Sequence, residues 1–108
     1  NNKAYILLRD GQTEAAADIL NELQDDLGKQ PWFQRNLALL YLQQDQFQDA
    51  IKILQEAVVA QPKLEHANYL LAKAHALLGN KSEACDYLQK AVKDNDPFAL
   101  VEEEITCN

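Results

Sequence analysis

Alanine and leucine residues recur along the chain at a spacing of 34 positions. Three sets of residues keep this spacing in three successive copies of the repeat. They are Ala16, Ala50 and Ala84, then Leu20, Leu54 and Leu88, and then Ala4, Ala38 and Ala72. A period shared by several positions is the signature of supersecondary units that stack side by side. The chain should therefore fold as a row of similar units.

Each unit contains two different helical patterns. In the segment 47–60 the apolar residues follow one helical face and polar residues follow the opposite face, which predicts a helix with one wet side. In the segment 32–42 the residues from 37 to 42 are apolar all the way round. Such a helix must contact neighbours on several sides. Alternation of these outer and inner helices predicts an α-solenoid.

Proline and asparagine residues separate the predicted helices. Pro31, Pro62 and Pro97 lie where a helix should begin or end. Asn80 should cap the helix that follows it, with Glu83 as its reciprocal partner. The pattern predicts helices at 3–9, 13–26, 32–44, 47–60, 65–78, 81–94 and 98–106.

The repeated positions resemble the tetratricopeptide repeat family. Residues 31–64 carry the best match, with Leu37, Ala38, Tyr41, Ala50, Leu54, Ala57 and Pro62. Residues 65–98 depart at His75, where the family has Tyr, and at Pro97, which comes one place late. The resemblance implies an all-α, right-handed α-solenoid of antiparallel helix–turn–helix repeats. It would hold about 2.5–3 units followed by a C-terminal capping helix.

We expect these units to form a single domain over residues 1–108. It would comprise a partial repeat at 1–30, repeats at 31–64 and 65–98, and a C-terminal helix at 99–108. The chain begins with Asn-Asn rather than Met and starts inside a repeat, so it should be a fragment of a larger protein.

The composition argues against several classes of function. The formal net charge of −7 repels phosphate, which disfavours nucleic acid as a partner and also a helical-repeat RNA reader. No apolar run is long enough to cross a bilayer. No phosphate-binding glycine loop, nucleophile elbow or metal-ligand cluster stands in the sequence. We therefore expect no enzyme, no cofactor and no metal site.

Members of the family receive an extended peptide or a partner helix in a concave groove lined by inner helices. The resemblance implies a protein-binding adaptor whose groove is lined by three helices. The candidate groove residues are Tyr5 on the first helix, Trp32, Arg35, Leu39 and Leu42 on the second, and His66, Tyr69 and Lys73 on the third. Aromatic and basic groups there suit a ligand with apolar side chains and acidic residues or a carboxylate. An equally weighted alternative is that Trp32 and Tyr69 cover the edge of the stack while Arg35 and Lys73 pair with nearby acidic residues.

A structural alternative for the whole chain is a spacer or self-association segment within a larger repeat protein. Two complete units are marginal alone, since about three repeats are needed for stability. Exposed apolar surface at the ends of the stack would then favour a homo-oligomer.

Two cysteines, one histidine and an acidic run remain to be interpreted. Cys85 and His75 occupy positions that hold apolar residues in other repeats, so both are expected in the core. A bridge from Cys85 to Cys107 would require the last helix to fold back over the third unit, and two free thiols are the expectation. The segment 102–104 is predicted to be a solvated helix face, with a negative edge that docks a partner or a neighbouring copy as the alternative.

Overall fold

The computed structural model describes residues 11–102, 105 and 107. Six helices follow one another within these residues, and no strand occurs among them. They are α2 (Thr13–Leu27), α3 (Pro31–Gln43), α4 (Phe47–Ala60), α5 (Ala67–Leu77), α6 (Lys81–Lys93) and α7 (Pro97–Leu100). The all-α solenoid prediction is confirmed. The helix predicted at 3–9, with the groove candidate Tyr5, lies outside the described residues.

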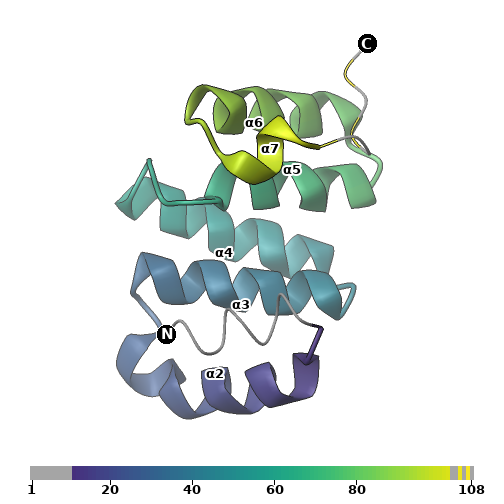
Figure 1. The fold of residues 1–108 in the computed structure, drawn as a ribbon. Helices are drawn as coiled ribbons and strands as arrows, with labels where there is room; N and C mark the ends of the chain where they lie inside the picture. The colour runs from purple at the N-terminus through teal and green to yellow at the C-terminus, as the bar shows by residue number, and fades with distance from the viewer. Residues whose placement is uncertain (1–10, 103–104, 106, 108) are drawn as a thin grey trace.

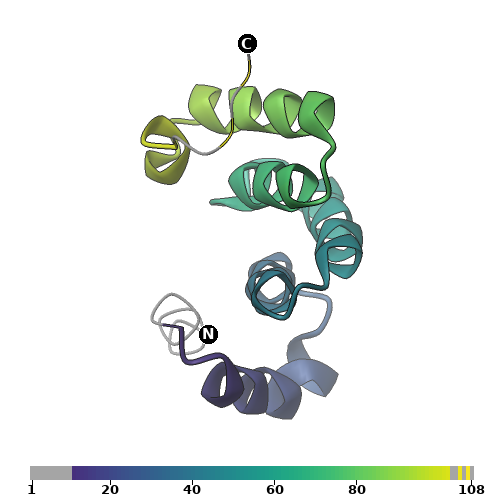
Figure 2. The ribbon, with the colours of Figure 1, turned by 90° about the vertical axis from the view of Figure 1, so that its right-hand side faces the viewer.

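The helices stack as successive antiparallel hairpins (Figure 1). Helix α3 packs on α4, and α5 packs on α6, while α4 joins the two hairpins by packing on α5. The stack curves into an arc, with α4 on its outer side and α7 on its open side. Figure 2 shows that α3 and α5 lie inside this arc, as expected for inner helices. No helix in the described ranges is both long and apolar enough to span a bilayer.

The core consists of two clusters of buried side chains. The first joins α3, α4 and α5 and contains Ala38, Ala50, Leu54, Ala57, Leu64, Ala67, Leu70 and Leu71. The second joins α2 and α3 and contains Ala16, Leu20, Phe33, Leu37 and Leu40. Four partly buried residues pack against both clusters, so the core is continuous from one unit to the next. They are Trp32, Leu39, Tyr41 and Ile53.

The alanines that recur every 34 residues lie at fully buried helix contacts. Ala16, Ala50 and Ala84 are 0% exposed, although they lie on three different outer helices. Ala38 and Ala72, on the inner helices, are also fully buried. Protein interiors are close-packed, so a position without free volume accepts only a small side chain. The repeat in the sequence is therefore a repeat of helix contacts.

Another repeated position marks the turns between helices. Gly11, Asp45 and Gly79 are spaced by the same period, and all three have positive φ angles, of 79°, 61° and 83°. After α3, the Asp45 N–H donates to the Leu42 carbonyl at 3.2 Å and the Gln46 N–H donates to the Tyr41 carbonyl at 2.8 Å. This pair of bonds is a Schellman motif, which needs a left-handed residue that glycine or a short polar side chain adopts most readily.

Two details at the helix ends differ from the prediction. Helix α5 begins at Ala67 rather than 65, because His66 has a φ of 68° and cannot be part of the helix. Asn80 precedes α6, but its side chain makes no capping hydrogen bond. Its Nδ2 instead lies 3.3 Å from Nδ1 of His75, so the predicted capping box is wrong. The core position of His75 is confirmed, since its buried ring stacks on Tyr87 with centroids 5.5 Å apart.

The end of the chain departs most from the prediction. Helix α7 ends at Leu100, so the helix predicted at 98–106 is wrong at 101, 102 and 105, the described residues of that range beyond α7. Asp96 caps α7 by accepting a hydrogen bond from the Phe98 N–H at 2.9 Å. A disulfide joins Cys85 to Cys107, with their Cα atoms 5.5 Å apart, so the expectation of two free thiols is also wrong. The disulfide brings Cys107 back to α6, and residues 101, 102, 105 and 107 are not helical, which the sequence pattern did not indicate.

Candidate functional site on the inner helices

The candidates on α3 are divided between the core and its surface. Trp32 is half-buried, packs on both core clusters and meets the Phe33 ring edge-to-face at 6.0 Å. Leu39 packs on both clusters and Leu42 on the first. These three side chains therefore contribute to the core while keeping part of their surface accessible.

Arg35 bridges the two inner helices. Its Nε and Nη2 donate to Oδ1 of Asn36 at 3.4 and 3.2 Å, and Nη1 donates to the Glu65 carbonyl at 3.4 Å. Asn36 is buried, so it fixes one side of the guanidinium. Glu65 precedes α5, and the contact holds the cation between α3 and the turn that leads into α5.

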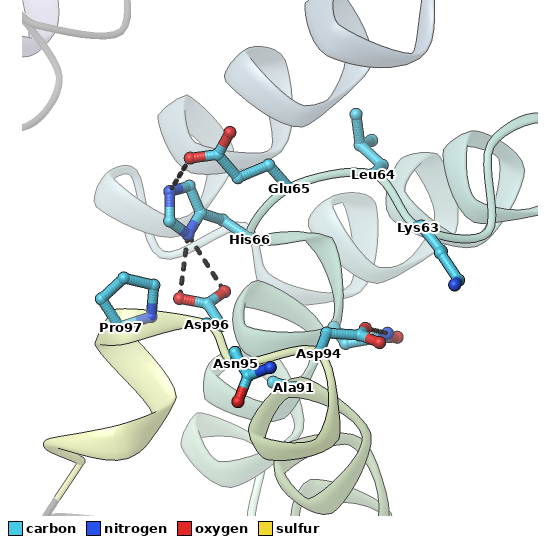
Figure 3. Close-up of a pocket in the computed structure, with 10 residues that line it drawn as sticks. Lys63, Leu64, Glu65, His66, Ala91, Asp94, Asn95, Asp96 and Pro97 are labelled. Atoms are coloured by element: carbon cyan, nitrogen blue, oxygen red, sulfur yellow. Dashed lines mark hydrogen bonds and ion pairs between the residues drawn. The ribbon is translucent and has the colours of Figure 1, made fainter.

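The candidate directly before α5, His66, is enclosed by acidic and aromatic groups. Its Nδ1 lies 3.0 Å from both carboxylate oxygens of Asp96, and its Nε2 lies 2.9 Å from Oε1 of Glu65 (Figure 3). The imidazole also stacks on the Phe98 ring, with centroids 4.4 Å apart. Beside it lies an open pocket of about 250 Å³ between the turns that precede α5 and α7. His66 thus joins the start of α5 to the start of α7.

The other two candidates on α5 meet a residue that follows α7. Oε1 of Glu102 accepts a hydrogen bond from the Tyr69 hydroxyl at 3.1 Å and pairs with Nζ of Lys73 at 3.0 Å. The Glu102 side chain is only 6% exposed, whereas Lys73 is 26% exposed. The Phe98 ring lies 5.7 Å from that of Tyr69. The prediction of a solvated Glu102 is wrong, because the turn after α7 directs this carboxylate onto α5.

Comparison with known proteins agrees with this architecture. A family model described as tetratricopeptide repeat matches residues 35–99. The chain belongs to the tetratricopeptide repeat family. Repeats of this family generally mediate protein–protein interactions and are typically non-catalytic. Among curated proteins, no sequence matches the chain significantly.

The tetratricopeptide repeat match includes only part of the segment that covers α5. Phe98 lies at its edge, while Glu102 and Cys107 lie beyond it. A signal for Phe98 was present in the sequence, because Pro97-Phe98 repeats the Pro31-Trp32 pair and both prolines start a helix. The role of Glu102 carried no such signal, since an acidic run is usually solvated.

The tetratricopeptide repeat surface on α5 offers three chemical groups close together. They are the aromatic rings of His66 and Tyr69, the Tyr69 hydroxyl and the Lys73 ammonium. Such a set holds an aromatic side chain and a carboxylate at the same time. In the part of the chain that the structure describes, no group of three or more His, Cys, Asp or Glu side chains is arranged so that it could hold a metal ion.

In this tetratricopeptide repeat chain, Tyr69 should titrate well above the usual range of a tyrosine. Burial raises its pKa from 10.0 to about 12, the Glu102 carboxylate adds to the rise, and the Lys73 charge opposes it. The phenol therefore remains a hydrogen-bond donor at neutral pH. We expect the difference in ultraviolet absorbance between the native chain and Tyr69→Phe to show a midpoint near pH 12. A midpoint near pH 10 would contradict the enclosed position of this hydroxyl.

Proposed function

We propose that the chain is a protein-binding adaptor that receives an extended peptide or a helix of its partner along the inner sides of α3 and α5. The observation that carries this proposal is the cluster of Tyr69 and Lys73 around a carboxylate, with an aromatic ring beside them. A partner with apolar and acidic side chains would find matching groups there. Trp32, Leu39 and Leu42 would supply apolar contacts on α3, and Tyr5 belongs to the same proposal.

Charge distribution supports an acidic partner. The chain carries a net charge of −7, yet the inner surface presents Arg35 and Lys73. Tyr, Trp and Arg are also the residue types enriched where binding energy concentrates in interfaces. A local cation on an acidic protein steers an acidic segment to one surface and discourages contact elsewhere.

The proposal is tested by reversing both inner cations. A partner would first be captured by crosslinking to the chain and identified by mass spectrometry. The double variant Arg35→Glu with Lys73→Glu should bind that partner at least about tenfold more weakly, because charge-assisted contacts become repulsive.

The matched control changes two exposed lysines on outer helices, Lys52→Glu with Lys81→Glu. This variant has the same net charge but leaves the inner surface intact, so its affinity should stay near that of the native chain. Equal affinity of the native chain and the inner double variant, both folded by circular dichroism, would overturn the proposal.

One observation favours a second function as a self-association segment. Leu100 and Val101 are 58% and 74% exposed at the end of the stack, where a further repeat would otherwise cover apolar surface. A concentration series by light scattering separates the two functions. A dimer that persists at low micromolar concentration would favour self-association over the adaptor.

A further inference from the structure

The described residues at the end of the chain (97–102, 105 and 107), here named the C-terminal strap, are attached to the repeats at three places. Phe98 stacks on His66, Glu102 pairs with Lys73, and Cys107 is joined to Cys85. The first two attachments fall on groove candidates of α5. The third falls on α6, the outer helix of the same hairpin.

The strap supplies the same chemistry as the partner in the proposed function. Its Phe98 ring lies against His66 and Tyr69, and the Glu102 carboxylate, four residues later, satisfies Lys73 and the Tyr69 hydroxyl. Because one ammonium is already paired with a carboxylate at 3.0 Å, an incoming acidic side chain must displace Glu102 to make this contact. The strap and a partner segment would therefore compete for α5.

The disulfide determines how firmly the strap competes. Beyond the Glu102 N–H, which donates to the Ala99 carbonyl at 3.3 Å, the described strap residues form no helix. The covalent link joins Cys85 to Cys107 across a sequence separation of 22 and keeps the strap at high effective concentration over α5. Cys107 is exposed, so a small thiol can reach the bond.

We propose that the C-terminal strap is an intramolecular occupant of the α5 surface whose release is controlled by reduction of the Cys85–Cys107 disulfide. This inference rests on the adaptor function and adds its regulation. A dithiol reductant supplies two electrons and two protons: one of its sulfurs attacks the disulfide, and its second sulfur closes a new disulfide on the reductant. Both cysteines leave as thiols, and α5 becomes available to a segment with an aromatic residue and a carboxylate.

The test uses a fluorescein-labelled peptide with the sequence of residues 96–105, which contains the aromatic and acidic groups but no cysteine. Its affinity for the whole chain is measured by fluorescence anisotropy before and after reduction with dithiothreitol. Reduction should tighten binding by at least about tenfold, since the surface is occupied in the oxidised chain for most of the time. A peptide in which alanine replaces Phe98 and glutamine replaces Glu102 should bind neither form.

Two variants of the chain control this experiment. Cys85→Ser with Cys107→Ser should bind the peptide as the reduced chain does, with or without dithiothreitol. If this variant fails to fold, Glu102→Gln with its disulfide intact provides the second test. It loses one non-covalent attachment, so the oxidised form should already bind the peptide more tightly than the oxidised native chain.

Equal affinity of the peptide for oxidised and reduced chains, with the helical circular dichroism signal retained, would overturn the strap proposal. Absence of binding in both states would overturn it as well, because the strap sequence would then have no affinity for α5. Neither result decides the adaptor function, which depends on the partner affinity of the Arg35→Glu with Lys73→Glu variant. The two proposals can therefore fail separately.

Discussion

Replacing Leu54 with alanine should lower the free energy of unfolding by about 2–5 kcal/mol, the range for a fully buried leucine. Leu54 is 0% exposed and lies on α4, where the first core cluster joins both hairpins. Removing its side chain would leave a cavity between α3, α4 and α5 that rigid helices fill only in part. The measurement is urea denaturation followed by circular dichroism at the helical band.

The repeat provides a matched control for this substitution. Leu88 occupies the same repeat position on α6 but is only partly buried, because in the described residues α6 is followed by the four-residue α7 and not by a full inner helix such as α5. Leu88→Ala should therefore cost clearly less than Leu54→Ala. Equal losses for the two variants would contradict the view that α4 is the central contact of the stack.

The helical stack could be predicted from the sequence because its information is local and repeated. Three kinds of position recur with the same 34-residue period: the leucine position of Leu54, the buried alanines, and the turn position that holds Gly11, Asp45 and Gly79. Each repeat therefore supports the interpretation of the others. The first residue of α5 was harder to predict from the sequence. His66 has a left-handed backbone conformation there, and a histidine gives little indication of such a turn.

The candidate site was predictable only on the side that belongs to the repeats. Tyr69 and Lys73 lie on α5 and His66 directly before it, as their spacing indicated. Figure 3 shows the His66 ring facing Asp96, which lies in the turn before α7. What covers them was predictable only in part, because Pro97-Phe98 has a counterpart in Pro31-Trp32, whereas Glu102 follows the last repeat and has no equivalent in an earlier unit. The disulfide depends on the same non-local path of the chain. The sequence period predicts contacts between repeats, and it gives no information about a segment that occurs only once.

The second large effect is expected from adding volume rather than removing it. Ala50→Leu should destabilise the chain by about 1–3 kcal/mol, because the new side chain has no space between α4 and α3. Ala50 is 0% exposed and belongs to the same cluster as Ala38 on the facing helix. Either the helices must separate or the leucine must adopt a strained rotamer. Thermal denaturation followed by circular dichroism would measure the loss.

Ala60→Leu is the control for Ala50→Leu, because it makes the same chemical change on the same helix at an exposed position. It should alter the free energy of unfolding by less than about 0.5 kcal/mol. Unchanged stability of Ala50→Leu would mean that α3 and α4 do not meet at this alanine, and the register of the hairpin would be wrong. The inner side of α3 depends on that register, since rotating the helix would move Arg35 away from Glu65 and α5. A stability measurement on an outer helix therefore also tests the surface proposed to bind the partner.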